Sequence, residues 1–227
     1  QLRAVLDLVD PAKLRAPFID INQRLYKQKF LEEFRYLGGF LVSIDGTGQF
    51  SSSHIHCSVC CERHHQNGQV GYYHQLLAAV LVHPDRKQVI PLFPEAITHQ
   101  DGATKNDCEA NASKRLLKQV HEAFPNWPLT VVEDSLSATG PHINLLKELK
   151  FSFIISVKPD GQESLFAEVK NRILEGKSEE FEVVGDDKII RGYRWVNGVP
   201  LNKSNPDLLV NFLDYWEIRE GKEFNFS

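Results

Sequence analysis

The sequence predicts an α/β protein in which helices flank a mixed sheet and a β-rich region follows at the C-terminal end. After a helical lead-in, three apolar runs of strand length follow one another with no helical pattern between them. Helical and strand patterns then alternate up to about residue 178, and only strand patterns follow. The chain has 227 residues, of which 42% are hydrophobic, so it can bury the core that this arrangement requires.

The first 37 residues are expected to form a helical lead-in. Leu25, Leu31 and Phe34 recur at helical spacing among charged residues, and Pro11 and Pro17 divide the segment into short pieces. We therefore expect short helices that pack on the domain that follows.

The next three elements are predicted to be an antiparallel meander. Residues 40–44 form an apolar, β-branched run that ends at Asp45-Gly46-Thr47. Residues 72–82 and 89–93 read as two further strands, joined by a polar turn that contains Pro84. The first of these strands is thus expected to end at a carboxylate.

An alternation of helices and strands follows the meander. Asp107 can cap a helix in which Ala112, Leu116 and Val120 lie four residues apart. A short buried strand over 129–132 ends at Glu133-Asp134, and a helix over 141–149, a strand over 151–157 and a helix over 164–174 come next. The predicted order is β-β-β-α-β-α-β, followed by a further helix.

The last 49 or so residues are predicted to be all-β. Strands over 181–184, 189–196 and 199–201 are expected, with Asn197-Gly198 as a two-residue hairpin turn. Residues 208–218 and 223–226 form a second predicted hairpin around Gly221. We divide the chain into a lead-in (1–37), a catalytic core (38–178) and a truncated β-rich insertion (179–227).

Charge and composition exclude several classes of protein. The chain has 26 basic and 30 acidic side chains and a net charge of −4, so it is not a polycation that coats nucleic acid, although a local basic groove remains open. The longest apolar stretch, 76–82, is far too short to span a membrane. Because methionine is absent and the sequence stops in a strand-like pattern, we expect a fragment, and with no signal segment an intracellular one.

Three of the four cysteines gather in one short segment. Cys57 and Cys60, followed by His64 and His65, have the spacing of zinc ligands on one side, and the second half of the site is irregular. The segment is either a loop stabilised by a structural Zn²⁺ or a polar loop with reduced thiols and solvated imidazoles. Four such ligands would leave zinc no open position, so both interpretations make the segment structural.

Two aspartates follow two apolar strands that are expected to be parallel neighbours. Asp45 and Asp134 would then meet at the carboxyl edge of the sheet, because neighbouring strands lie about 4.8 Å apart. Carboxylate oxygens suit Mg²⁺ or Mn²⁺, and such ions can activate water and stabilise the leaving oxygen of a phosphodiester. Taken singly, each aspartate is more typical of a turn or a cap, but their matched positions after two apolar strands favour the metal site.

These residues resemble the catalytic domain of insertion-sequence DDE transposases, in the branch with a β-rich insertion. The resemblance covers roughly residues 38–160 well and the rest loosely. Its motifs lie in five segments: 41–47, 72–84, 89–92, 100–102 with 107–115, and 131–134. It implies a ribonuclease-H-like fold, with Asp45 and Asp134 as the first two catalytic metal ligands. One departure is Ser137, at a position where the family often has an aromatic residue.

The resemblance also implies an activity and its partners. Water bound to one metal ion cleaves double-stranded DNA at the element end, and the freed 3′ hydroxyl attacks target DNA. A homodimer in the DNA complex and a cytoplasmic, nucleoid-associated location in a bacterium are further implications. The family's third carboxylate sits on a helix after the insertion. Glu217, Glu220 and Glu223 lie in hairpin-like sequence, so the fragment is expected to lack this ligand.

Two other functions remain open, and so do the residues that would hold DNA. The chain is alternatively a catalytically inactive, transposase-derived domain that binds DNA or protein, or a zinc-stabilised interaction module. Glu109 is a candidate outer group of the acidic site. Phosphate or base contacts are assigned to seven residues, each of which is equally explained as part of a solvated face or a small core: Lys105, Lys114, Arg115, Lys118, Lys158, Arg194 and Trp195.

Overall fold

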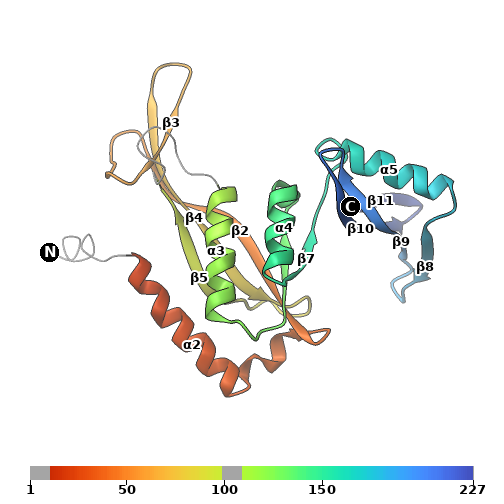
Figure 1. The fold of residues 1–227 in the computed structure, drawn as a ribbon, viewed down its shortest axis with the longest axis horizontal. Helices are drawn as coiled ribbons and strands as arrows, with labels where there is room; N and C mark the ends of the chain where they lie inside the picture. Colours follow the sequence, from red (N-terminus) through yellow and green to blue (C-terminus); the bar gives the residue numbers. More distant parts are fainter. Residues whose placement is uncertain (1–10, 99–108, 227) are drawn as a thin grey trace. The chain divides into compact units, whose positions relative to one another are not determined.

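The computed structural model describes residues 11–98 and 109–226 (Figure 1). The chain divides into two compact units, Gln1–Ser137 with Leu145–Ile154 and Ala138–Asn144 with Ile155–Ser227. The first unit is a mixed sheet with helices, and the second is an antiparallel sheet with one helix. The predicted α/β class with a separate antiparallel sheet is therefore confirmed. No helix among the described residues is long and apolar enough to cross a membrane.

The first unit is built on a seven-stranded mixed sheet. Its strands are β1 (Arg35–Tyr36), β2 (Gly39–Ser52), β3 (Cys61–His64), β4 (Val70–Val82), β5 (Ile90–Ile97), β6 (Leu129–Glu133) and β7 (Ser152–Ile155). β2 pairs antiparallel with β4 and parallel with β6, and β5 and β3 pair with successive parts of β4. The long strands therefore lie in the order β5-β4-β2-β6-β7.

Helices cover one face of this sheet. They include α2 (Arg15–Lys27) and α3 (Glu109–Ala123), with short 3₁₀ helices η1 (Pro11–Leu14), η2 (Phe30–Phe34) and η3 (Ser135–Ser137). A further helix, α4 (Gly140–Glu148), is divided between the units, since residues 140–144 belong to the second unit. α3 packs on β4 and β5, and α2 packs on β5. Ala112, Leu116 and Val120 of α3 are buried against alternate residues of the sheet, such as Val42 and Ala79. The predicted helix is thus present, and its proposed cap Asp107 lies outside the described residues.

One strand differs from its predicted length. β2 does not end at Asp45 but continues to Ser52, because β4 pairs with it from Leu41 opposite Val82 to Ser52 opposite Tyr72. What ends near Asp45 is burial: Ile44 is the last buried residue of the strand. The Asp45-Gly46 pair is therefore part of a paired strand and not a turn.

The second unit is a four-stranded antiparallel sheet with one helix. It contains α5 (Glu163–Leu174), β8 (Glu179–Val184), β9 (Ile190–Asn202), β10 (Asn205–Arg219) and β11 (Lys222–Phe226), in the sheet order β11-β10-β9-β8. Leu165 and Val169 of α5 pack into a core with Val196, Val199 and Phe212. The helix placed with the core domain by sequence thus packs on the second sheet.

The prediction of a hairpin turn at Asn197-Gly198 is wrong. β9 runs through both residues, and they oppose the single residue Asn211 of β10 in a β-bulge of β9. Gly198 supplies the left-handed conformation that the bulge needs (φ 66°), and its N–H donates to Asn211 Oδ1 at 3.1 Å. The true turn follows Asn202, whose side-chain oxygen accepts a hydrogen bond from the N–H of Ser204 at 3.1 Å.

Candidate functional site: an acidic pair and a thiol–imidazole cluster

The register between β2 and β6 aligns two aspartates. The last pair of this parallel ladder is Ser43 opposite Val132. Asp45 lies two residues further along β2, and Asp134 directly follows the end of β6 at Glu133, so both aspartates lie at the same edge of the sheet. Adjacent strands are separated by about 4.8 Å, which lets two carboxylates at one level reach a common cation.

Both aspartates belong to the face of the sheet that α3 leaves uncovered. Side chains alternate along a strand, and the neighbours Ile44 and Glu133 are buried on the α3 side, where Ser113 of α3 donates a hydrogen bond to Glu133 at 3.3 Å. Asp45 and Asp134 are exposed on the opposite side, next to the half-buried Ser43. The pair is therefore accessible from solvent.

Each carboxylate is held by one backbone amide of its own segment. Asp45 Oδ1 accepts from the N–H of Gly46 at 2.8 Å, and Asp134 Oδ1 accepts from the N–H of Leu136 at 3.0 Å. A carboxylate has about four acceptor positions, so each aspartate keeps capacity for a cation. This donor set consists of hard oxygens and fits Mg²⁺ or Mn²⁺.

Glu109 lies close to this edge, but on the other face of β2. Its carboxylate accepts a hydrogen bond from the side-chain amide of Gln75 and touches Gly46, where an added Cβ would lie 2.4 Å from Glu109 Oε1. Gly46 therefore lets the first turn of α3 approach the strand next to Asp45. Glu109, the expected outer group of the acidic site, therefore lies across the sheet from Asp45.

Within the described chain, no third carboxylate forms a three-ligand group with this pair. The three glutamates considered from the sequence are all in the second unit, on the β10–β11 hairpin. Glu217 is buried and accepts hydrogen bonds from Tyr215 and from Arg219 Nε at 2.6 Å. Tyr215 is the main cause of the lowered pKa of Glu217, with Arg219 next, and the same bond raises the pKa of Tyr215.

The basic residues assigned to DNA on α3 lie away from the acidic pair. Lys114 and Lys118 are exposed on the outer side of α3, opposite its buried face, whereas the aspartates lie beyond the sheet. Arg115 instead forms an ion pair with the buried Glu95, with Nε at 2.7 Å from Oε1. Lys105 lies outside the described residues.

The remaining DNA-binding candidates are in the second unit. Arg194 donates to Glu180 at 2.7 Å and stacks over Trp216 at 5.1 Å from the ring centroid. Trp195 is half-buried and lies edge-on to Phe181, at 6.2 Å between centroids. Lys158 is exposed. Arg194 is thus engaged within its own sheet, and the side chains of Trp195 and Lys158 retain solvent-accessible surface.

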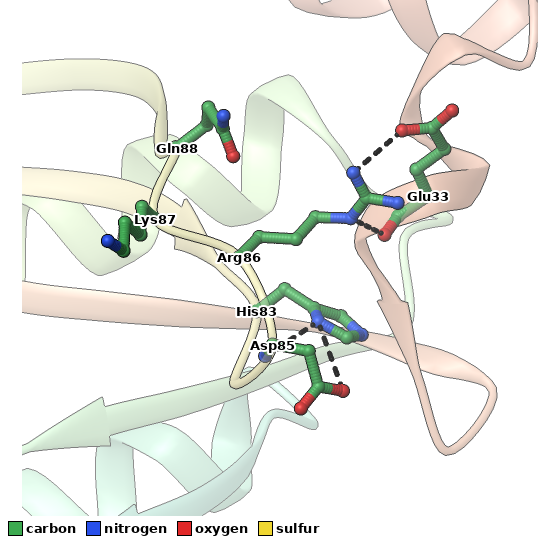
Figure 2. Close-up of a pocket in the computed structure, with 6 residues that line it drawn as sticks. All are labelled: Glu33, His83, Asp85, Arg86, Lys87 and Gln88. Atoms are coloured by element: carbon green, nitrogen blue, oxygen red, sulfur yellow. Dashed lines mark hydrogen bonds and ion pairs between the residues drawn. The ribbon is translucent and has the colours of Figure 1, made fainter.

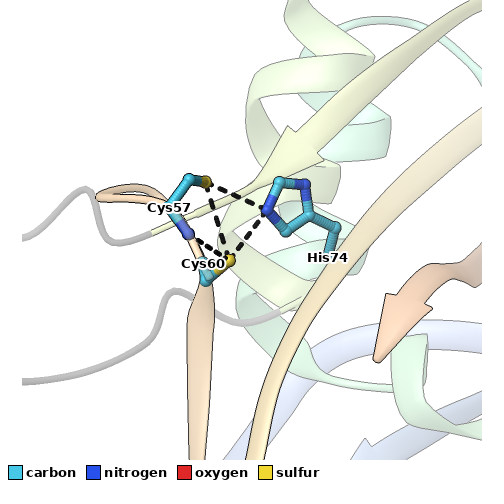
Figure 3. Close-up of side chains that lie close together, drawn as sticks. All are labelled: Cys57, Cys60 and His74. Atoms are coloured by element: carbon cyan, nitrogen blue, oxygen red, sulfur yellow. Dashed lines mark hydrogen bonds between the residues drawn. The ribbon is translucent and has the colours of Figure 1, made fainter. Parts of the chain in front are cut away.

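A thiol–imidazole cluster forms a second site in the first unit (Figure 3). Cys57 and Cys60 lie in the loop before β3, and His74 lies on β4. The sulfur atoms are 3.6 Å apart, and His74 Nε2 is 3.3 Å from Cys57 Sγ and 3.0 Å from Cys60 Sγ. Burial raises the pKa of the Cys60 thiol above its usual value. Among the described residues, this is the one group that gathers three metal-ligating atoms within 4.8 Å.

The histidine of this cluster differs from the two that spacing alone predicts. His64 and His65 are not in the group; His64 instead contacts Glu62 at 3.3 Å. β3 runs antiparallel along β4, with Cys61 opposite Tyr73 and His64 opposite Val70, so the chain moves away from the thiols as it reaches His64. The same register places His74 beside Cys60. Linear spacing cannot find this residue, but a predicted β3–β4 pairing could.

An open hollow of about 630 Å³ lies at the other end of the sheet (Figure 2). It surrounds the turn after β4, where Arg86 pairs with Glu33 at 2.8 Å and His83 faces Asp85 at 3.9 Å. Val82 pairs with Leu41 at the start of β2, so this hollow is remote from the edge that carries Asp45.

No protein-family model matches the chain, and no curated protein sequence is significantly similar to it.

Proposed function

We propose that this chain carries two of the metal ligands of a DNA transposase catalytic core, whose complete active site cleaves and joins double-stranded DNA with divalent metal ions. The observation that carries the proposal is the placement of two exposed aspartates at one edge of the sheet: Asp45 lies on β2, and Asp134 directly follows β6, the parallel neighbour of β2. A pair of carboxylates in this position suits Mg²⁺ or Mn²⁺.

The order of elements gives independent support. Three consecutive antiparallel strands (β2, β4 and β5) precede a helix, and the two later strands add on the other side of β2 to give β5-β4-β2-β6-β7. This is the order expected of a ribonuclease-H-like sheet, in which the first strand is central. The separate sheet β8–β11 follows, as the resemblance to transposases with a β-rich insertion leads us to expect.

The carboxylates and backbone amides at this edge of the sheet would contribute to catalysis by positioning the cation and by their charge. Asp45 and Asp134 would hold the cation, and the amides of Gly46 and Leu136 would fix the orientation of the two carboxylates. A divalent cation held there would activate a water molecule and stabilise the leaving 3′ oxygen of a phosphodiester. The exposed face around Ser43 would leave space for a DNA strand.

Metal binding tests this proposal directly. We expect the protein to bind Mn²⁺, measured by the water-proton relaxation of the bound ion, and we expect Asp45→Asn and Asp134→Asn each to weaken binding by more than about tenfold. Manganese-dependent nicking of supercoiled DNA should fall in the same two variants. Asp85→Asn, which removes an exposed carboxylate at the opposite edge, is the matched control. Equal Mn²⁺ affinity in wild type and both edge variants would refute the proposal.

A further inference from the structure

The cluster of Cys57, Cys60 and His74 has the separations of a tetrahedral metal shell. Zinc lies about 2.3 Å from thiolate sulfur and about 2.0–2.1 Å from imidazole nitrogen. At tetrahedral angles these lengths require about 3.8 Å between two sulfurs and about 3.6 Å between sulfur and nitrogen. The observed separations are 3.6 Å, 3.3 Å and 3.0 Å, so changes of about 0.6 Å or less in these separations would complete the geometry.

The chemistry of the three donors selects the ion. Two sulfurs and one imidazole are a soft to borderline set, which zinc prefers and which Mg²⁺ and Mn²⁺ do not. The sulfurs are also too far apart for a disulfide, whose S–S length is about 2.05 Å. Both cysteines are free thiols in this structure.

The surroundings show what a bound ion would do. The loop that carries the two cysteines has little apolar anchorage, since Ile55 and Val59 are 60% and 49% exposed. Cys60, by contrast, is buried at the base of the loop. An ion bound to Cys57, Cys60 and His74 would fasten this loop to β4, as Figure 3 shows by the way the three side chains converge.

The cluster is separate from the acidic pair but lies on the same hairpin. His74 is opposite Phe50 on β2, and Ala78, four residues along β4, is opposite Asp45. Four residues of strand span about 13 Å. The ion would thus stabilise the extension of β2 and β4 beyond the acidic edge without sharing a ligand with it.

We propose that Cys57, Cys60 and His74 bind one Zn²⁺ ion that anchors the loop before β3 to β4. No other His, Cys, Asp or Glu of the described chain joins the group, so one tetrahedral position remains for a further ligand. This proposal does not depend on the proposed DNA chemistry.

The metal content of the purified chain tests the proposal. We expect one zinc per chain by mass spectrometry of the metal, and loss of at least nine-tenths of it in Cys57→Ser, Cys60→Ser and His74→Gln. His64→Gln and His65→Gln are the matched controls and should retain their zinc. Zinc that survives in His74→Gln but is lost in either control, or a wild-type chain that folds without zinc, would overturn the assignment.

Two further measurements guard against variants that do not fold. Chelator-treated wild-type chain should take up one Co²⁺ and show the intense thiolate-to-cobalt charge-transfer absorption of two sulfurs. Removal of the metal by the chelator should also speed proteolysis within residues 53–60. It should leave the Mn²⁺ binding of the wild-type chain unchanged. A Cys57–Cys60 disulfide in protein purified without oxidants, with no cobalt absorption after reduction, would refute the metal site.

Discussion

At the scale of single residues, two glycines allow contacts that any side chain would block. An added Cβ at Gly46 would meet the flexible end of Glu109, whereas one at Gly192 would lie 1.9 Å from Trp216 Cε2. Trp216 is buried opposite Gly192 on β10, donates to Glu182 at 3.3 Å and lies under the guanidinium of Arg194. The indole ring therefore occupies the space that a side chain at position 192 would need.

We predict that Gly192→Ala destabilises the second sheet. The indole would have to move, and overpacking of this kind typically costs about 1–3 kcal/mol. Urea unfolding followed by tryptophan fluorescence measures the change. Gly48→Ala is the control, because nothing lies within 4 Å of its added Cβ; we expect an effect within about 0.5 kcal/mol. Removing the ring with Trp216→Leu should reduce the penalty at position 192, and an undiminished penalty would contradict this explanation.

Single residues also mark the limit of prediction from the sequence. Asp45 and Asp134 could be singled out as candidates because each directly follows a buried strand segment, and the end of burial is visible in the apolar pattern even where, as in β2, the strand continues. His74 could not be predicted from the spacing of ligands along the chain, because it meets Cys60 through the pairing of β3 with β4. Long-range register is set by packing and turns, and not by the spacing of ligands along the chain.

At the scale of elements, turn chemistry was the least predictable feature. Asn197-Gly198 is the strongest hairpin signal in the sequence, yet the same left-handed glycine serves a bulge within β9. The turn between β10 and β11, by contrast, follows its sequence: Glu220 and Gly221 both have positive φ, as a tight two-residue turn requires. An Asn-Gly pair therefore specifies a backbone conformation, and the neighbouring strands decide how it is used.

The turn between β8 and β9 contains a pH-dependent ion pair. Asp187 accepts hydrogen bonds from Arg191 Nη2 at 2.6 Å and from the N–H of Ile189 at 3.1 Å. The hydrogen bond from Arg191 is the main cause that lowers the pKa of Asp187 to about 2. Since the pKa is lower in the folded state, the pair stabilises the fold above the unfolded value of about 3.9 and is lost as the pH falls toward 2.

We predict that Asp187→Asn lowers the melting temperature at pH 6 and that this difference shrinks between pH 4 and pH 2.5. Thermal unfolding of both proteins across this range measures the effect. Asp186→Asn removes the adjacent exposed carboxylate, which is not part of this ion pair, and serves as the control. A difference that stays constant down to pH 2.5 would show that the carboxylate acts through something other than its charge.

At the scale of the whole molecule, the sequence predicts the layers better than it predicts which layer each helix joins. The order of strands and helices follows from apolar periodicity, and the structure contains those elements. α5 has the amphipathic pattern expected of either sheet, and only the fit of Leu165 and Val169 against Val196 and Phe212 assigns it to the second. Apolar periodicity identifies a buried helix face but not its partner.

A buried ion pair connects distant segments of the first unit. Glu95 on β5 has a side-chain exposure of 8% and contacts Arg15 of α2 at 3.1 Å and Arg115 of α3 at 2.7 Å. These three residues come from three elements that meet only in the folded chain. Arg115, a candidate DNA contact in the sequence, is thus part of the internal support of the sheet.

We predict that Glu95→Gln destabilises the first unit by about 2–3 kcal/mol, because it leaves two partly buried guanidinium groups without their counter-charge. Glu33→Gln is the matched control, because it breaks the exposed pair with Arg86 (Figure 2) and should cost less than about 1 kcal/mol. Urea unfolding in low salt and in 1 M salt distinguishes the two variants. Salt screens the exposed pair of Glu33 and acts less on the buried pairs of Glu95, so only the loss in Glu33→Gln should shrink at high salt. Equal, salt-sensitive losses in both variants would mean that Glu95 is a surface charge in solution and that α2 and α3 are held to β5 by apolar packing alone.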